Sequence, residues 1–191
     1  MTQKTNMKIN VHHVTRVEGH GNINVTVRDG KLIEAQWAVV ETPRFFEAML
    51  RGKAHELAPT LTSRICGICS IGHTLASLRT VERTMDVEIP KTAQSLRLLA
   101  KHGETVQSHA LHVFFLAAPD LLGVDSVIPL IESHPAVVGV AVRLKGLGND
   151  LCDLVAGRTT DPVSLVVGGV SKAPQKKDLE AMRQTLQDRL A

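Results

Sequence analysis

Hydrophobic and polar residues alternate along the first forty residues. The alternation runs from Lys8 to Val14 and resumes after an Arg16–Gly21 interruption in two further runs of apolar positions: Ile23, Val25 and Val27, then Ile33, Ala35, Trp37 and Val39. A period of two predicts half-buried strands. Asp29-Gly30 divides the second and third strands, and this dipeptide predicts a hairpin.

The hairpin has two possible registers. A two-residue loop at Asp29-Gly30 sets Val25 opposite Glu34. A bulge or a three-residue connection instead gives these pairs: Val27 with Ile33, Val25 with Ala35, and Ile23 with Trp37. The second register makes one continuous apolar face, and we prefer it.

Helical periodicity replaces the alternation after residue 41. Thr42-Pro43 predicts the start of a short helix that ends before Gly52, with these residues on its buried side: Phe45, Phe46, Met49 and Leu50. Another helix is predicted to begin near Cys69. Two long helices follow, roughly Thr92–Ala118 and Pro135–Ala156.

The C-terminal part of the chain reads as a loop over Thr159–Pro174 and then as an amphipathic helix. Its apolar stripe comprises Leu179, Met182, Leu186 and Leu190. An unpaired stripe indicates that a partner segment or a missing continuation completes the core. The predicted fold class is therefore α+β: an antiparallel β region over residues 1–41, packed on a bundle of long helices over residues 42–191.

Composition excludes several classes of protein. The net charge is only +3 and aromatic residues make up 3% with no tyrosine, so neither a basic nucleic-acid footprint nor a stacking platform is present. The apolar segment from 134 to 157 contains four charged residues, which argues against a membrane span: Arg143, Lys145, Asp150 and Asp153. Three cysteines and an N-terminus without an apolar run predict free thiols and a cytoplasmic location.

The candidate chemistry lies between Arg64 and His73, where Cys66 and Cys69 form a Cys-x-x-Cys and His73 follows four residues later. This spacing suits soft-metal ligation, a redox dithiol or half of a structural zinc site. His109 and His112 are the zinc candidates, although they are far along the chain. A thioredoxin-like dithiol requires a strand directly before the pair, and the Pro59 approach instead favours a helix.

Three other residues have ordinary interpretations when taken singly. Glu18 lies in a turn and Glu47 on the polar side of a short helix, where solvated acids are common. Cys152 reads as a small buried apolar residue.

The ordered motifs together resemble the N-terminal half of the nickel-iron hydrogenase large subunit. They occur in that family's order: Thr15–His20, Thr42–Glu47, Arg64–Cys69 with His73, Leu75-Ala76-Ser77, Ser108–His112, Gly157-Arg158 and Asp161–Gly169. The likeness spans essentially the whole chain. Within the family, it is strongest to the cytoplasmic, multi-subunit type that feeds heterodisulfide reductase.

The resemblance assigns roles to five residues. Cys66 is implied to be a nickel ligand, and Cys69 to bridge nickel to an iron that carries carbon monoxide and cyanide. It implies that His73 hydrogen-bonds the bridging sulfur and that Glu18 relays protons. Glu47 resembles an acidic ligand of Mg2+.

The implied reaction is reversible heterolytic cleavage of H2. Electrons would leave through iron-sulfur clusters of a separate small subunit, because three cysteines are too few to hold such clusters here, and pass to an electron-acceptor complex.

One part of the family pattern is missing. Its second cysteine pair and terminal histidine are absent, so a complementary chain or missing segment is needed to complete the metal site. The alternative is a metal-free homologue that acts as a non-catalytic assembly or interaction subunit.

Overall fold

The computed structural model describes residues 5–190 and divides into two compact units. The first unit extends to Glu47 and the second begins at Ala48. Helix α1 (Pro43–Leu50) lies across this division, and the domain boundary expected between residues 41 and 42 stays a prediction. The expectation drawn from the extreme N-terminus falls largely on residues 1–4, which lie outside the described residues, as does Ala191.

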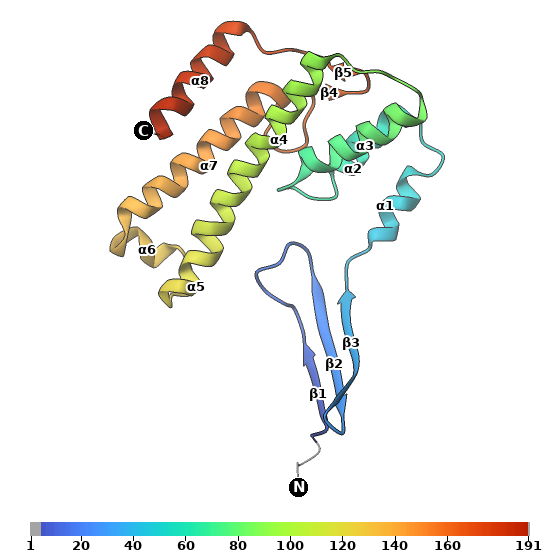
Figure 1. Ribbon diagram of the computed structural model, residues 1–191, viewed down its shortest axis with the longest axis vertical. Helices are drawn as coiled ribbons and strands as arrows, with labels where there is room; N and C mark the ends of the chain where they lie inside the picture. Colours follow the sequence, from blue (N-terminus) through green and yellow to red (C-terminus); the bar gives the residue numbers. More distant parts are fainter. Residues whose placement is uncertain (1–4, 191) are drawn as a thin grey trace. The chain divides into compact units, whose positions relative to one another are not determined.

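The first unit contains a three-stranded antiparallel sheet (Figure 1). Its strands are β1 (Met7–Val11), β2 (Gly21–Arg28) and β3 (Lys31–Val39), with β2 in the middle. The strands that the alternation predicted are therefore confirmed.

The register of the hairpin follows the bulged alternative. Three pairs define it: Ile23 with Trp37, Val25 with Ala35, and Val27 with Leu32. The first two pairs were predicted, whereas Ile33 was expected in place of Leu32. The difference arises because Asp29 and Gly30, with φ of 51° and 76°, form a two-residue turn, and a bulge near Val27 absorbs the extra residue.

Helix α1 has the predicted start and is followed by Gly52 at φ 73°, but its apolar face is not buried. Phe45 is 58% exposed and lies edge-to-face against Phe46, with ring centroids 6.0 Å apart. The expectation of a buried face was wrong because periodicity shows which side chains share a face, not whether another element covers it.

The second unit is built from helices. Their bounds are α2 (Ala58–Ser63), after a 3₁₀ turn at His55–Leu57, α3 (Ser70–Thr84), α4 (Lys91–Leu111), α5 (Ala118–Leu122), α6 (Ile128–Ser133), α7 (Pro135–Ala156) and α8 (Lys176–Leu190). The first long helix predicted is α4, which continues through a π-helical segment, His112–Ala117, into α5. The second is α7, bounded by Pro135 and by Gly157 in the left-handed region. Helix α6 was not predicted.

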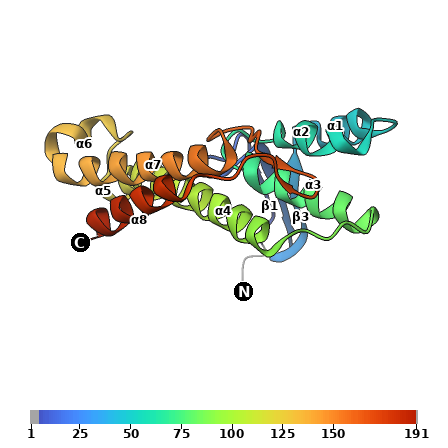
Figure 2. The ribbon, with the colours of Figure 1, turned by 90° about the horizontal axis from the view of Figure 1, so that it is seen from above.

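Helices α4 and α7 lie side by side and antiparallel, with α8 next to α7 (Figures 1 and 2). Glycines allow α4 and α7 to approach closely. A Cβ atom on Gly148 would lie 2.5 Å from the backbone nitrogen of Gln107, and one on Gly103 would lie 3.0 Å from Cys152 Sγ. The two glycines therefore fix where α4 crosses α7.

The core of the second unit joins α3, α4, α7 and the short hairpin of β4 (Leu165–Val166) and β5 (Gly169–Val170). Its buried members include Ile71, Leu78, Leu96, Ala100, Leu151, Val155 and Leu165. Helices together with an antiparallel sheet and a separate hairpin confirm the α+β class. None of the helices in the described part of the chain has the length and apolar character needed to cross a membrane.

Candidate metal centre

Cys66, Cys69 and His73 come together at the start of α3. Cys66 lies in the short connection after α2, Cys69 is the N-cap residue of α3, and His73 is in the first turn of that helix. Their ligand atoms all lie within 4.8 Å of one another, and within residues 5–190 no other cluster of three such side chains meets this criterion.

The structure joins Cys66 and Cys69 in a disulfide, so the expectation of free thiols is wrong for this pair. The turn that leads into α3 places their Cα atoms 5.5 Å apart, a separation that a disulfide readily spans. Metal ligation uses the reduced, deprotonated sulfurs. The backbone N–H of Cys69 already donates to Cys66 Sγ at 3.2 Å, which favours negative charge on that sulfur.

The histidines considered for a zinc site do not belong to this cluster. His109 lies near the end of α4 and His112 begins the π-helical segment, and both are exposed. Neither joins the cysteines in the described part of the chain. The helix α2 before the cysteine pair also lacks the strand that a thioredoxin-like site requires.

Cys152 cannot add a third thiolate because it lies fully buried in the second unit's core, with its Sγ 3.8 Å from the carbonyl oxygen of Ala100. Burial, followed by the charges of Glu104 and Asp153, raises the pKa of Cys152 to about 12. The interpretation as a buried apolar residue is confirmed. The clustered donors, two soft sulfurs and an imidazole, thus fit one half of a four-thiolate nickel-iron site.

Two residues of α4 hold the cysteine segment from one side. The buried carboxylate of Glu104 accepts the N–H groups of Ile71, at 2.8 Å, and Gly72, at 3.2 Å, in the first turn of α3. Gln107 donates from Nε2 to the carbonyl oxygen of Ile68 at 3.1 Å. These contacts fix the backbone on both sides of Cys69.

The connection after α7 holds the same segment from the other side. Thr160 Oγ1 donates to the carbonyl oxygen of Gly67 at 3.2 Å, and the Asp161 N–H donates to Ser70 Oγ at 2.9 Å. The carboxylate of Asp161 also forms an ion pair with Arg64. Both ends of the Cys-x-x-Cys turn are therefore tied to a segment about ninety residues away in sequence.

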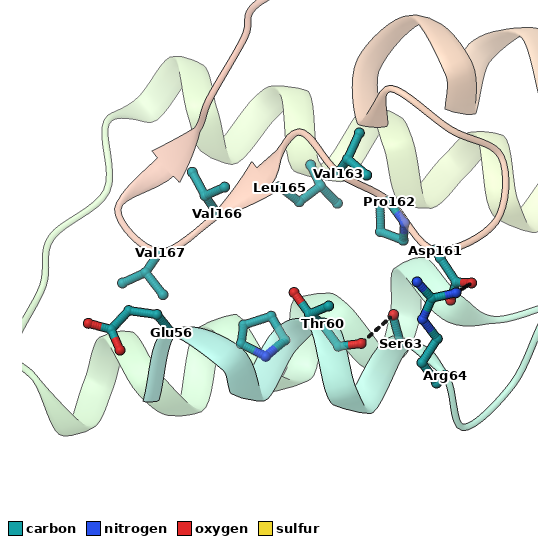
Figure 3. A pocket seen from close by; sticks show the side chains of 11 residues that line it. Glu56, Thr60, Ser63, Arg64, Asp161, Pro162, Val163, Leu165, Val166 and Val167 are labelled. Atoms are coloured by element: carbon teal, nitrogen blue, oxygen red, sulfur yellow. Dashed lines mark hydrogen bonds and ion pairs between the residues drawn. The ribbon is translucent and has the colours of Figure 1, made fainter. Parts of the chain in front are cut away.

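A pocket of about 380 Å³ lies beside this anchor, between α2 and the segment from 161 to 167. Figure 3 shows Thr60 and Ser63 on the α2 side and Pro162 on the facing segment, with Arg64 and Asp161 meeting at one end. The pocket thus has an apolar wall and one charged end, and that end is next to the residues that precede Cys66.

The sequence contained a signal for Glu104 and Gln107 that we did not use. Both occur at helical spacing from Ala100 on the buried side of α4, where the stripe otherwise consists of small and apolar residues. A charged residue in such a stripe is buried only when it is paired or hydrogen-bonded. The partners themselves could not be inferred from this spacing.

Glu18 and Glu47 belong to the first unit, whereas the cysteines belong to the second. Glu18 is exposed in the connection between β1 and β2. Glu47 is exposed near the end of α1, with its Oε2 3.6 Å from Arg44 Nε. The roles assigned to these two acids, and to Cys66, Cys69 and His73, stay predictions.

The chain is similar to known hydrogenases in sequence. The family described as nickel-dependent hydrogenase matches residues 44–135, and the family described as HoxL-like matches residues 8–42. The alpha subunit of sulfhydrogenase 2 from Pyrococcus furiosus is 36% identical over 91% of this chain and 42% of the relative. A vhc subunit of the F420-non-reducing hydrogenase from Methanococcus voltae is 38% identical, over 96% of this chain and 40% of the relative.

Solved structures agree with the sequence matches. An NAD+-reducing [NiFe]-hydrogenase in the H2-reduced state superposes with a TM-score of 0.83 at 31% identity, over 98% of this chain and 43% of that chain. The Ni-Fe-Se hydrogenase of Desulfovibrio vulgaris Hildenborough superposes with a TM-score of 0.79 at 26% identity, over 97% of this chain and 41% of that chain. The chain spans about two fifths of the length of these relatives.

Proposed function

Because the chain belongs to the nickel-dependent hydrogenase family, as the counterpart of the N-terminal part of the large subunit, we propose that it supplies half of a nickel-iron centre for the reversible heterolytic cleavage of H2. The observation that supports this most strongly is the convergence of Cys66, Cys69 and His73 within 4.8 Å at the start of α3. The other two thiolates come from a complementary chain or from a segment beyond this sequence.

In this proposal the reduced sulfurs of Cys66 and Cys69 bind the metals, Cys66 to nickel and Cys69 to both nickel and iron. When bound, the centre supplies the Lewis-acidic metals, with iron carrying carbon monoxide and cyanide, at which H2 is polarised. The hydrogen bond from the Cys69 N–H to Cys66 Sγ and the anchored turn support the assignment, because sulfurs held at fixed positions lose little freedom when they bind a metal.

The protons are handled by this chain's side chains. A cysteine sulfur can hold a proton at Sγ, and we assign the next transfer to the carboxylate of Glu18. His73 donates an imidazole N–H to the bridging sulfur of Cys69 and so limits its charge. The motif Thr15–His20 supports the role of Glu18, and the shared first turn of α3 supports that of His73.

The proposal also includes two further cofactor assignments and the assembly. Glu47 is a Mg2+ ligand, since a carboxylate is a suitable hard oxygen donor. The electrons go to an iron-sulfur small subunit, which passes them to an electron-acceptor complex. A reducing, cytoplasmic compartment suits the site because its sulfurs ligate metals only when reduced.

Metal analysis of the assembly that contains this chain tests the proposal. We expect nickel and iron together, with infrared bands from carbon monoxide and cyanide. Cys66→Ser should remove nickel, whereas the matched variant Cys152→Ser, which changes the cysteine buried in the helical core, should retain it. Zinc alone, no metal, or full nickel content in Cys66→Ser would contradict the proposal, and a metal-free assembly would favour the non-catalytic alternative.

A further inference from the structure

Glu104 is a buried acid for which the proposed function has no role. Its exposed fraction is 2%, and α4 carries it to the first turn of α3, 33 residues away in sequence. A buried carboxylate is retained only where its charge and its oxygen atoms are matched by donors. The donors that match it show what it holds in place.

Both oxygens of Glu104 are used. Oε1 accepts the N–H of Ile71 at 2.8 Å and that of Gly72 at 3.2 Å, and Oε2 accepts the same Gly72 N–H at 3.2 Å together with the ammonium of Lys101. These N–H groups belong to the first turn of α3, where a helix has no internal acceptors. Glu104 therefore does from a distant helix what a side-chain cap usually does locally, and Cys69, the N-cap residue, makes no such side-chain hydrogen bond.

The two anchored N–H groups lie between the proposed metal ligands. Ile71 is two residues after Cys69, and Gly72 directly precedes His73. Fixing this backbone sets the direction in which the Cys69 sulfur and the His73 ring leave α3. Gln107, one turn further along α4, fixes the residue before Cys69 through the Ile68 carbonyl group and is itself held by the ammonium of Lys145 at 2.8 Å.

We propose that Glu104 is a positioning residue for the metal-binding set of Cys66, Cys69 and His73, acting through the backbone of Ile71 and Gly72. This inference rests on the proposed function for the identity of the metal, but not for the geometry. Groups behind a metal ligand that orient it typically contribute about 10- to 100-fold to metal affinity.

A matched control exists in the same unit. Glu82 is also a buried acid, 5% exposed, and it also accepts a backbone N–H, that of Gly168 at 2.9 Å, together with the charge of Arg97. Its partners lie at the far end of α3 from the cysteines. Glu82→Gln therefore reproduces the loss of a buried charge without touching the cysteine turn.

The test is a Co2+ titration of the reduced full chain, followed by the sulfur-to-Co2+ charge-transfer absorption. We expect Glu104→Gln to lower the Co2+ affinity about tenfold or more and to change the absorption spectrum, with faster amide hydrogen exchange at Ile71 and Gly72. Glu82→Gln should lower thermal stability while leaving affinity and spectrum within about threefold of the parent, since only the ligand geometry affects these readouts.

The inference is overturned if Glu104→Gln binds Co2+ within threefold of the parent with the same spectrum, or if Glu82→Gln loses as much affinity. Glu104→Asp, which keeps the charge beside Lys101 but withdraws the oxygens, gives the same test if the glutamine variant does not fold. These results are separable from those of the proposed function. An assembly without nickel would refute the hydrogenase proposal and leave the Co2+ result intact, whereas unchanged Co2+ binding would refute only the role of Glu104.

Discussion

Arg97 of α4 forms two hydrogen bonds with the carboxylate of Glu82 on α3, at 2.9 and 2.6 Å, and both side chains are only 6% exposed. The same guanidinium donates to the carbonyl oxygens of Val166, at 2.7 Å, and Gly169, at 3.0 Å. One cation thus joins α3, α4 and the β4–β5 hairpin. Such bidentate geometry is specific to arginine.

Arg97→Met should destabilise the fold by about 3 to 5 kcal/mol, because it leaves Glu82 buried without its cation and two carbonyl groups without a donor. Chemical denaturation measures this. Lys176→Met breaks an exposed pair with Glu180, whose atoms are 3.6 Å apart, and should change stability by less than about 0.5 kcal/mol. Equal effects of the two substitutions would contradict the structural role of Arg97.

The same pair predicts a loss of stability in acid. Burial acts to raise the pKa of Glu82, but hydrogen bonds from Arg97 and Gly168 and the charge of Arg97 outweigh it, so the pKa lies below its ordinary value of 4.5. The contribution is then fully present above about pH 5.5 and is lost as the pH falls through 4.5 towards the lower folded-state pKa. Denaturation midpoints between pH 3 and 7 should show this dependence, and Glu82→Gln should reduce it.

Gly148→Ala should push α7 away from α4. The added Cβ would lie 2.5 Å from the Gln107 backbone nitrogen and 2.8 Å from the Gly103 carbonyl oxygen, neither of which can rotate away. We expect a cost of about 1 to 3 kcal/mol or more in thermal unfolding.

Gly146→Ala is the control for that substitution, since it lies on the same helix and its Cβ would meet no atom within 4 Å. It should stabilise the chain by up to about 1 kcal/mol through helix propensity. Destabilisation by Gly146→Ala as large as that by Gly148→Ala would show that the helix, not the contact, is responsible.

Cys152 should resist alkylation in the folded, reduced chain. Burial raises its pKa to about 12, so its reactive thiolate is scarce at pH 8, while Cys69 is partly exposed. Iodoacetamide followed by mass mapping should label Cys69 first and Cys152 only after unfolding. Because the folded-state pKa is raised, this thiol also stabilises the fold below pH 9 and ceases to do so as the pH rises towards 12. Rapid native labelling of Cys152 would contradict its burial.

The sequence by itself determined the local features. The alternation at β2 and β3, Pro135 and Gly157 at the ends of α7, and the Cys66–Cys69 spacing each depend on residues only a few positions apart. Their backbone preferences and side-chain periods are therefore readable without a fold. The ordered motifs were also sufficient to indicate the family.

Only the tertiary structure decided what surrounds those features. The bulge that pairs Val27 with Leu32, the exposure of Phe45, and the contact of Glu104 with the start of α3 depend on how separate elements pack. Hydrogen bonds that span 33 residues, as at Ile71, or 91 residues, as at Ser70, leave no periodic trace in the sequence. Their partners are selected when α3, α4 and the connection after α7 enclose a common interior and each buried polar group must find a donor or acceptor there.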